Sequence, residues 1–261
     1  MSTRLTMNDR AHDAHAKVFL RYLGDIERRE GLRPHEAMKQ WLELAFRALR
    51  GRLLIGDAFQ QNEDAYLKLV RGYRDPSATM DDMSALLGVA TAALSDAAVD
   101  FVGPIFAEVA ASNSLGQFFT PHHVSTAMAS MILADARSML ESCGRPFLLC
   151  HEPACGVGGM VLAANEVLRA QDIDCARQVH WVMVDVDFMA MCGAYVQCSL
   201  TNASATVIHG NTLTLAEWMT SVTTAAALFP KRATAAGSPP TSDTSSNSPP
   251  VPASEQIAFQ F

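Results

Sequence analysis

Segment 152–159 of this chain, Glu-Pro-Ala-Cys-Gly-Val-Gly-Gly, constrains its fold more than any other stretch. A short apolar run at 147–150 precedes the segment, and a pattern typical of a helix follows over 159–169. Glycine adopts backbone conformations that are closed to other residues, and it lets the chain approach a ligand closely. A strand, a glycine-rich turn and a helix in this order are typical of open α/β sheets, which bind ligands beyond the carboxyl ends of their strands. The sequence therefore predicts a ligand site at this turn.

The alternation of apolar runs and helices continues beyond the turn. Apolar runs at 179–184 and 206–208 are separated by a helical pattern over 189–200. Upstream, Thr120 and Pro121 are typical of a helix cap and a first helical residue. Short apolar runs between helices of this length predict βαβ units and a parallel sheet. The predicted fold class is α/β, with a Rossmann-like sheet that lacks its later strands and an α-helical module in front of it.

Three zones with different residue patterns divide the chain. Residues 1–110 carry apolar residues at helical spacing, as in 37–49 and 80–94, and are expected to form an α-helical module. Residues 111–220 hold the predicted α/β domain. Residues 221–261 are expected to be a disordered tail, because 236–255 consist mainly of Ser, Pro, Thr and Ala, which cannot build a core. The arginines of the first zone indicate either a solvated helix face or a surface for phosphates.

The charge balance and the cysteines exclude several classes of protein. The 261 residues carry a formal net charge of −7, which argues against binding nucleic acid alone by general electrostatics. A partner could supply the basic face. Six scattered cysteines fit neither a zinc site nor a secreted disulfide framework. With no signal peptide and no membrane-spanning apolar stretch visible, we expect a cytoplasmic protein with no metal and no membrane contact.

Two carboxylates stand at the ends of the first two predicted strands. Asp185 is well placed to accept hydrogen bonds from ribose hydroxyls, which suits any adenosine-containing cofactor. A NAD site would want Gly-x-Gly-x-x-Gly, and an ATP site Gly-x-x-x-x-Gly-Lys, whereas this chain has Gly-x-Gly-Gly-Met-Val. Glu152 would repel a phosphate but suits a positively charged group. The residues thus favour S-adenosylmethionine over a generic nucleotide.

Segments 116–121 (Gly-Gln-Phe-Phe-Thr-Pro) and 152–159 resemble, in this order, two motifs of the adenine-N6 DNA methyltransferases, above all the modification subunit of type I restriction-modification systems. The resemblance covers about residues 112–218 and implies S-adenosylmethionine as the cofactor. In that family the first motif covers the methionine end of the cofactor, the second forms the glycine loop, an acidic residue binds the ribose and a Gly-Asp-x-Leu turn contacts the adenine. The residues that match these roles are Phe118, Phe119, Thr120, Pro121, Glu152, Ala154, Gly156, Gly158, Asp185 and Asn211.

Two departures from the family pattern concern the adenine turn and the catalytic motif. Asn211 stands where the family has Asp, and its side-chain oxygen can still accept a hydrogen bond from the adenine amino group. The family catalyses with Asn/Asp/Ser-Pro-Pro-Tyr/Phe, whose aromatic ring stacks on the flipped base. Here the two Ser-Pro-Pro triplets are followed by Thr241 and Val251 and lie in the low-complexity tail. No catalytic residue is therefore identified, and the chain matches only the cofactor-binding half.

The resemblance implies a DNA adenine-N6 methyltransferase of the type I modification-subunit kind. A partner chain, such as a specificity or second methylase subunit, must then contact the DNA and hold the base. The alternative is a non-catalytic cofactor-binding or interaction protein that derives from a methyltransferase and modulates a restriction-modification complex. A remnant that neither binds nor transfers is a third interpretation. Because the incomplete sheet leaves an edge strand, we also expect a homo- or hetero-oligomer.

Overall fold

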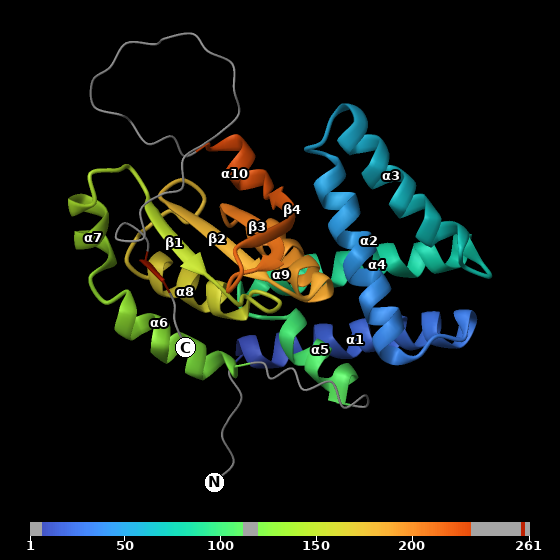
Figure 1. The fold of residues 1–261 in the computed structure, drawn as a ribbon. Coiled ribbons are helices and arrows are strands. Elements are labelled where there is room, and N and C mark those ends of the chain that lie inside the picture. Colours follow the sequence, from blue (N-terminus) through green and yellow to red (C-terminus); the bar gives the residue numbers. More distant parts are fainter. Residues whose placement is uncertain (1–6, 112–119, 231–256, 259–261) are drawn as a thin grey trace.

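The computed structural model describes residues 7–111, 120–230 and 257–258 (Figure 1). Five helices come first: α1 (Met7–Glu30), α2 (Pro34–Gly51), α3 (Gly56–Arg71), α4 (Pro76–Asp96) and α5 (Val102–Ala111). Strands and helices then alternate, after two further helices: α6 (His122–Ile132), α7 (Ala136–Ser142), β1 (Leu148–Glu152), α8 (Gly159–Arg169), β2 (Val179–Asp185), α9 (Phe188–Leu200) and β3 (Ala205–Asn211). The last elements are β4 (Ala216–Val222), α10 (Thr224–Leu228) and β5 (Ile257–Ala258).

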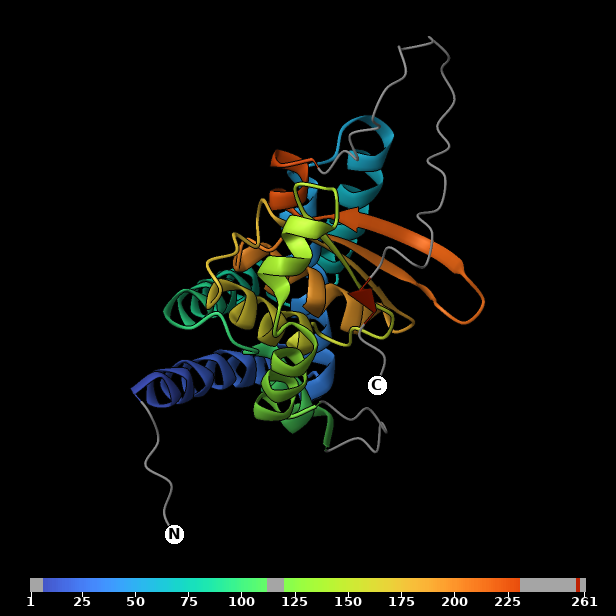
Figure 2. The ribbon, with the colours of Figure 1, turned by 90° about the vertical axis from the view of Figure 1, so that its left-hand side faces the viewer.

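The strands form one sheet in the order β4-β3-β2-β1-β5. Neighbouring strands are parallel, except that β4 runs antiparallel to β3. The β3–β4 hairpin projects from the body of the molecule and carries Leu213 and Leu215 at its exposed tip (Figure 2). The predicted α/β class with an α-helical N-terminal module is confirmed. Residues 209–211 continue β3 through an irregularity between His209 and Gly210, and the turn into β4 follows them.

One face of the sheet is covered by helices and the other is only partly covered within the described part of the chain. From β1 to β2 and from β2 to β3 the chain moves to the next strand on the same side of the sheet. Because such connections between parallel strands are right-handed, α8 and α9 lie on the same face. Trp181 and Met183 point to that face and are buried. The alternate residues His180, Val182 and Thr206 are half-buried. This alternation is typical of a sheet with one buried face rather than two.

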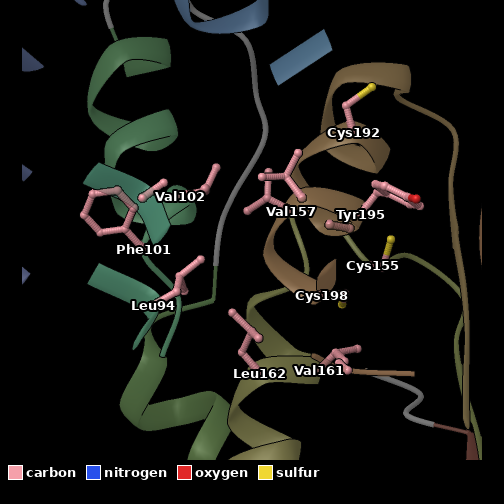
Figure 3. Close-up of a cluster of buried hydrophobic side chains, with 14 of the residues drawn as sticks. Leu94, Phe101, Val102, Cys155, Val157, Val161, Leu162, Cys192, Tyr195 and Cys198 are labelled. Atoms are coloured by element: carbon pink, nitrogen blue, oxygen red, sulfur yellow. The ribbon is translucent and has the colours of Figure 1, made fainter. Parts of the chain in front are cut away.

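The α-helical module packs onto the α/β domain through α2 and α9. The ring of Phe46 meets those of Tyr195 and Phe188 edge-on, at 5.0 and 6.0 Å between ring centres. A second junction lies at the connection between α4 and α5, where Leu94, Phe101 and Val102 belong to the same buried cluster as Val157 of the glycine-rich turn (Figure 3). Buried apolar residues therefore continue across the expected boundary near residue 110.

The C-terminal boundary differs from the expected start of a tail at residue 221. Residues 216–222 form β4, which extends into the segment assigned to the tail, and α10 and β5 lie within that segment. Thr223 explains the order at this point, because its hydroxyl donates to the Ala203 carbonyl and accepts from the Ala205 amide, at 2.7 and 3.0 Å. The Ser-Pro-rich residues 236–255 lie outside the described residues.

None of the helices in the described ranges combines the length and the apolar character that a bilayer crossing requires.

The junction between α2 and α9 predicts a single cooperative unfolding transition. Replacing the fully buried Phe46 by Ala should lower the free energy of unfolding by about 3–5 kcal/mol, because the cavity opens between the two parts of the core. Phe59 on α3 is 40% exposed and provides the same substitution outside the core, where the loss should be less than half as large. Chemical denaturation followed by far-UV dichroism and by tryptophan fluorescence gives both values. Separate transitions for the two signals in the unmodified protein would contradict a shared core.

Candidate functional site

The turn between β1 and α8 takes a conformation that requires glycine. Gly156 and Gly158 have φ values of +53° and +93°, in the left-handed region that favours this residue. A side chain at Gly158 would also come within 3.2 Å of the Ala194 backbone on α9. The turn is therefore tight and lies against the helix that follows the next strand. This segment, 153–158, is called the glycine loop below.

Asp185, at the end of β2, holds the glycine loop in place. One oxygen of its carboxylate accepts the Gly156 amide at 2.7 Å and the other accepts the Asp187 amide at 2.9 Å. Burial raises the pKa of this carboxyl, and the two amide hydrogen bonds oppose the shift. Each oxygen has a second lone pair, so the carboxylate keeps the capacity to accept hydrogen bonds from a ligand.

A pocket of about 90 Å³ opens beside the glycine loop at the carboxyl end of β1. Its walls combine loop residues with residues from four other segments: Asp100, Thr120, Ser125, Glu152, Ala154, Cys155, Gly156, Val157, Gly159 and Met160. Four residues predicted from the sequence are thus brought together: Thr120, Glu152, Ala154 and Gly156. No group of three or more His, Cys, Asp or Glu side chains in the described ranges is arranged to hold a metal ion.

Glu152 is the most unusual side chain of the pocket. It is 2% exposed, and its Oε1 accepts the Ala154 amide at 3.3 Å. Its Oε2 is buried without a hydrogen-bond partner. Burial raises the pKa of this carboxyl to about 7; the Ala154 amide opposes the shift and the charge of Asp185 adds to it. A buried carboxyl with an unused oxygen is costly in the empty protein and is suited to a ligand that brings a donor or a positive charge.

Two polar residues of the site were missed by the sequence analysis. Asp100 reaches the pocket from the connection between α4 and α5. Gln197 lies fully buried on α9, where its Nε2 donates to Asp100 Oδ1 and to the Val157 carbonyl at 2.8 and 2.9 Å. Its Oε1 accepts the Phe101 and Val102 amides at 3.0 and 3.2 Å. The only signal in the sequence was a single Gln within the otherwise apolar and uncharged pattern of α9.

The Thr-Pro part of the first motif lies at the start of α6. Thr120 is exposed and lines the pocket. Pro121 is the cap residue, and its carbonyl accepts the Val124 and Ser125 amides at 2.9 and 3.1 Å. The helix therefore begins one residue later than Thr120 and Pro121 indicated, a shift within the usual uncertainty of helix ends. Phe118 and Phe119 lie outside the described residues.

Asn211 lies at the end of β3, on the other side of the glycine loop from α6. Its side-chain oxygen accepts the Leu213 and Thr214 amides at 3.0 and 3.2 Å and so closes the turn into β4. That oxygen is engaged within the turn, which leaves the amide NH₂ as the group available to a ligand. The neighbouring Thr212 donates its hydroxyl to the Pro153 carbonyl at 2.6 Å. The Asn211 turn and the glycine loop are therefore fixed to each other.

Comparisons with known proteins identify a family for this chain. A family model described as N-6 DNA methylase matches residues 98–229, about half of the chain. Among solved structures, the chain is similar to a putative class I S-adenosylmethionine-dependent methyltransferase from Listeria monocytogenes, with 15% sequence identity and a TM-score of 0.47. The match covers 78% of this chain and 55% of that chain, so this chain spans little more than half of that protein. No curated protein matches the chain in a sequence search.

The raised pKa of Glu152 predicts that this residue lowers stability at alkaline pH. Its ordinary pKa of 4.5 and its folded pKa of about 7 mean that the folded protein keeps a proton that the unfolded chain loses between these pH values. Stability from this group therefore falls as pH rises through that window. Replacing Glu152 by Gln should raise the free energy of unfolding at pH 8 by up to roughly 3 kcal/mol and should change it little near pH 4.

Guanidinium denaturation of both proteins at pH 4, 6 and 8 measures this difference. Glu217, exposed on β4, is a suitable control, because its replacement by Gln should produce no pH-dependent gain. A Glu152→Gln protein that is less stable than the original at pH 8 would show that the carboxylate is compensated by a cation, against the geometry of the pocket.

Proposed function

The chain belongs to the N-6 DNA methylase family, and we propose that it binds S-adenosylmethionine in the pocket beside the glycine loop and serves DNA adenine-N6 methylation as a type I modification-subunit-like component. S-adenosylmethionine is the cofactor that membership of the family implies. The observation that carries the proposal is the buried Glu152 carboxyl, which lines the pocket beside the glycine loop and has one oxygen without a hydrogen-bond partner.

The residues of the pocket fit this cofactor. Its methionine end carries an ammonium and a sulfonium group, both positive, and the pocket offers carboxyl groups without a paired Lys or Arg among the described residues. A phosphate in the same place would be repelled by Glu152. Asp100 lies directly against the start of α8, since a Cβ at Gly159 would come within 2.5 Å of its Oδ2. Residues of the glycine loop thus form part of the pocket wall, and the carboxyl groups of Glu152 and Asp100 lie in the same wall.

Each element of the site has a distinct task in the proposed reaction. When bound, the cofactor supplies a methyl group that is activated by a positively charged sulfur. Glu152 holds the positive end of the ligand, and Asp185 accepts hydrogen bonds from ribose hydroxyls while it fixes the Gly156 amide. Asn211 presents its amide group beside the adenine-binding side of the loop. These residues bind and orient; none of them needs to exchange a proton with the substrate.

The base-holding part of the reaction is assigned to a partner chain. The sequence has no Pro-Pro pair followed by an aromatic residue: Thr241 and Val251 stand at those positions. At the other side of the sheet, β3 turns directly into the antiparallel β4 instead of a helix and a further parallel strand. We assign DNA contact and adenine binding to a specificity or second methylase subunit, in keeping with the net charge of −7.

The alternative function is a cofactor-binding protein that modulates such a complex without catalysing transfer. The missing motif favours it, and so do the arginines of the α-helical module. Arg29 pairs with Asp82 at 2.7 Å and Arg47 with Glu43 at 2.6 Å, so two of the cations that could contact phosphates are engaged within the module. Both functions require cofactor binding, and only methyl transfer separates them.

Calorimetric titration with S-adenosylmethionine tests the shared part of both functions. The protein should bind one equivalent saturably, and Asp185→Ala should reduce the affinity below detection, because it removes the ribose acceptor and frees the Gly156 amide. Asp64→Ala, which removes an exposed aspartate on α3, serves as the control and should bind normally. Dichroism shows whether each variant is folded. Absence of binding by the folded, unmodified protein would refute both functions.

A methyl-transfer assay then distinguishes the two functions. Labelled cofactor and unmodified adenine-containing DNA are incubated with this chain alone and together with specificity and methylase subunits of type I systems. We expect no transfer by the chain alone and label on adenine N6 in the assembled mixture. A cofactor-binding protein that transfers no label in any combination would support the modulatory function and refute the catalytic one.

A further inference from the structure

The connection between α4 and α5 brings a second carboxylate to the cofactor pocket. Asp100 lies two residues before the start of α5, and its Oδ1 accepts hydrogen bonds from the Gly103 amide and the Gln197 side chain, both at 2.8 Å. These bonds fix the side chain so that Oδ2 faces the start of α8. A Cβ placed on Gly159 would lie 2.5 Å from this oxygen, so only glycine at that position leaves room for it.

Asp100 and Glu152 each have one carboxylate oxygen that accepts no hydrogen bond within the described residues. Neither Asp100 Oδ2 nor Glu152 Oε2 accepts a hydrogen bond from any residue in the described ranges. No Lys or Arg in those ranges forms an ion pair with either side chain. Burial raises the pKa of Asp100, and its hydrogen bonds with Gln197 and Gly103 oppose the shift. Both carboxyls line one pocket, and burial raises the pKa of each, a cost that a positively charged ligand would offset.

The two oxygens without a hydrogen-bond donor, Asp100 Oδ2 and Glu152 Oε2, suit one group of the cofactor better than the others. A sulfonium carries charge but no hydrogen, so it cannot fill an empty acceptor position. A primary ammonium carries three N–H donors and can bond to both oxygens at once. The two carboxylates therefore suit the α-ammonium of the methionine end better than its sulfur.

On the basis of the proposed function, we propose that Asp100 binds the α-ammonium group of the cofactor together with Glu152. The α-helical module then supplies part of the cofactor site and is not only a support for it. Because Gln197 ties Asp100 to the Val157 carbonyl, ligand binding also fixes the α4–α5 connection against the glycine loop.

Asp100→Asn tests the contact with two ligands that differ in one group. S-adenosylhomocysteine has the α-ammonium, and its desamino analogue lacks it but keeps the carboxylate and the adenosine. The substituted side chain keeps an oxygen for Gly103 and Gln197 and turns an NH₂ toward the pocket. We expect the variant to bind S-adenosylhomocysteine roughly 10- to 100-fold more weakly, the range for loss of a charged hydrogen bond. The analogue should bind to both proteins with similar affinity.

The matched control is Asp96→Asn, which removes the same charge from an exposed position at the end of α4. It should leave both affinities unchanged. An equal loss for the two ligands in Asp100→Asn would refute the ammonium contact, because it would indicate a deformed pocket. Unchanged binding of S-adenosylhomocysteine would refute it as well. If the unmodified protein binds neither ligand, the proposed function fails with it, whereas binding without this selectivity overturns only the inference.

A measurement on the unmodified protein decides the case if the variant does not fold. Hydrogen–deuterium exchange reports on the amides of Phe101, Val102 and Gly103, which are bonded to Gln197 and Asp100. Saturating S-adenosylhomocysteine should slow their exchange more than the saturating desamino analogue does. Equal protection by both ligands would overturn the proposal.

Discussion

The buried side-chain amide of Gln197 connects the parts of the structure on which the site depends. Its four hydrogen bonds reach the α4–α5 connection, Asp100 and the glycine loop, and they leave no polar atom of the side chain unused. A buried polar network in which every hydrogen bond is formed tolerates little displacement, because moving one group leaves another buried group without its partner. The position of the glycine loop relative to the α-helical module is therefore set by this one residue on α9.

The burial of α9 on every side explains why the module and the sheet form one core. Residues 190–198 are all buried, since the sheet covers one side of the helix and α2 the other. A helix that is apolar all round must be enclosed in this way. The α-helical module thus provides the second layer that a one-sided sheet needs. It also brings Asp100 to the ligand pocket, so structural and functional roles coincide in the same contact.

Acidic side chains lie close together at the pocket, and none of them forms an ion pair with a Lys or Arg among the described residues. Glu152 and Asp100 line the pocket, and Asp185 bonds to the glycine loop beside it; burial raises the pKa of all three. Such an arrangement lowers the stability of the empty protein and favours a positively charged ligand, which is the character of S-adenosylmethionine. No Pro-Pro pair in the sequence is followed by an aromatic residue that would hold a target adenine, and the proposed function therefore separates cofactor binding from catalysis.

Local signals in the sequence determined the glycine loop, the helix α8 with its bounds, the first three strands and the placement of Glu152 and Asp185. These features depend on short-range rules: left-handed glycines, helical spacing of apolar residues and the ends of apolar runs. Tertiary structure alone decided that β4 runs antiparallel, that the Asn211 oxygen closes its own turn and that Asp100 lines the pocket. Asp100 and Gln197 lie 97 positions apart, and no local pattern encodes a hydrogen bond between residues that only folding brings together.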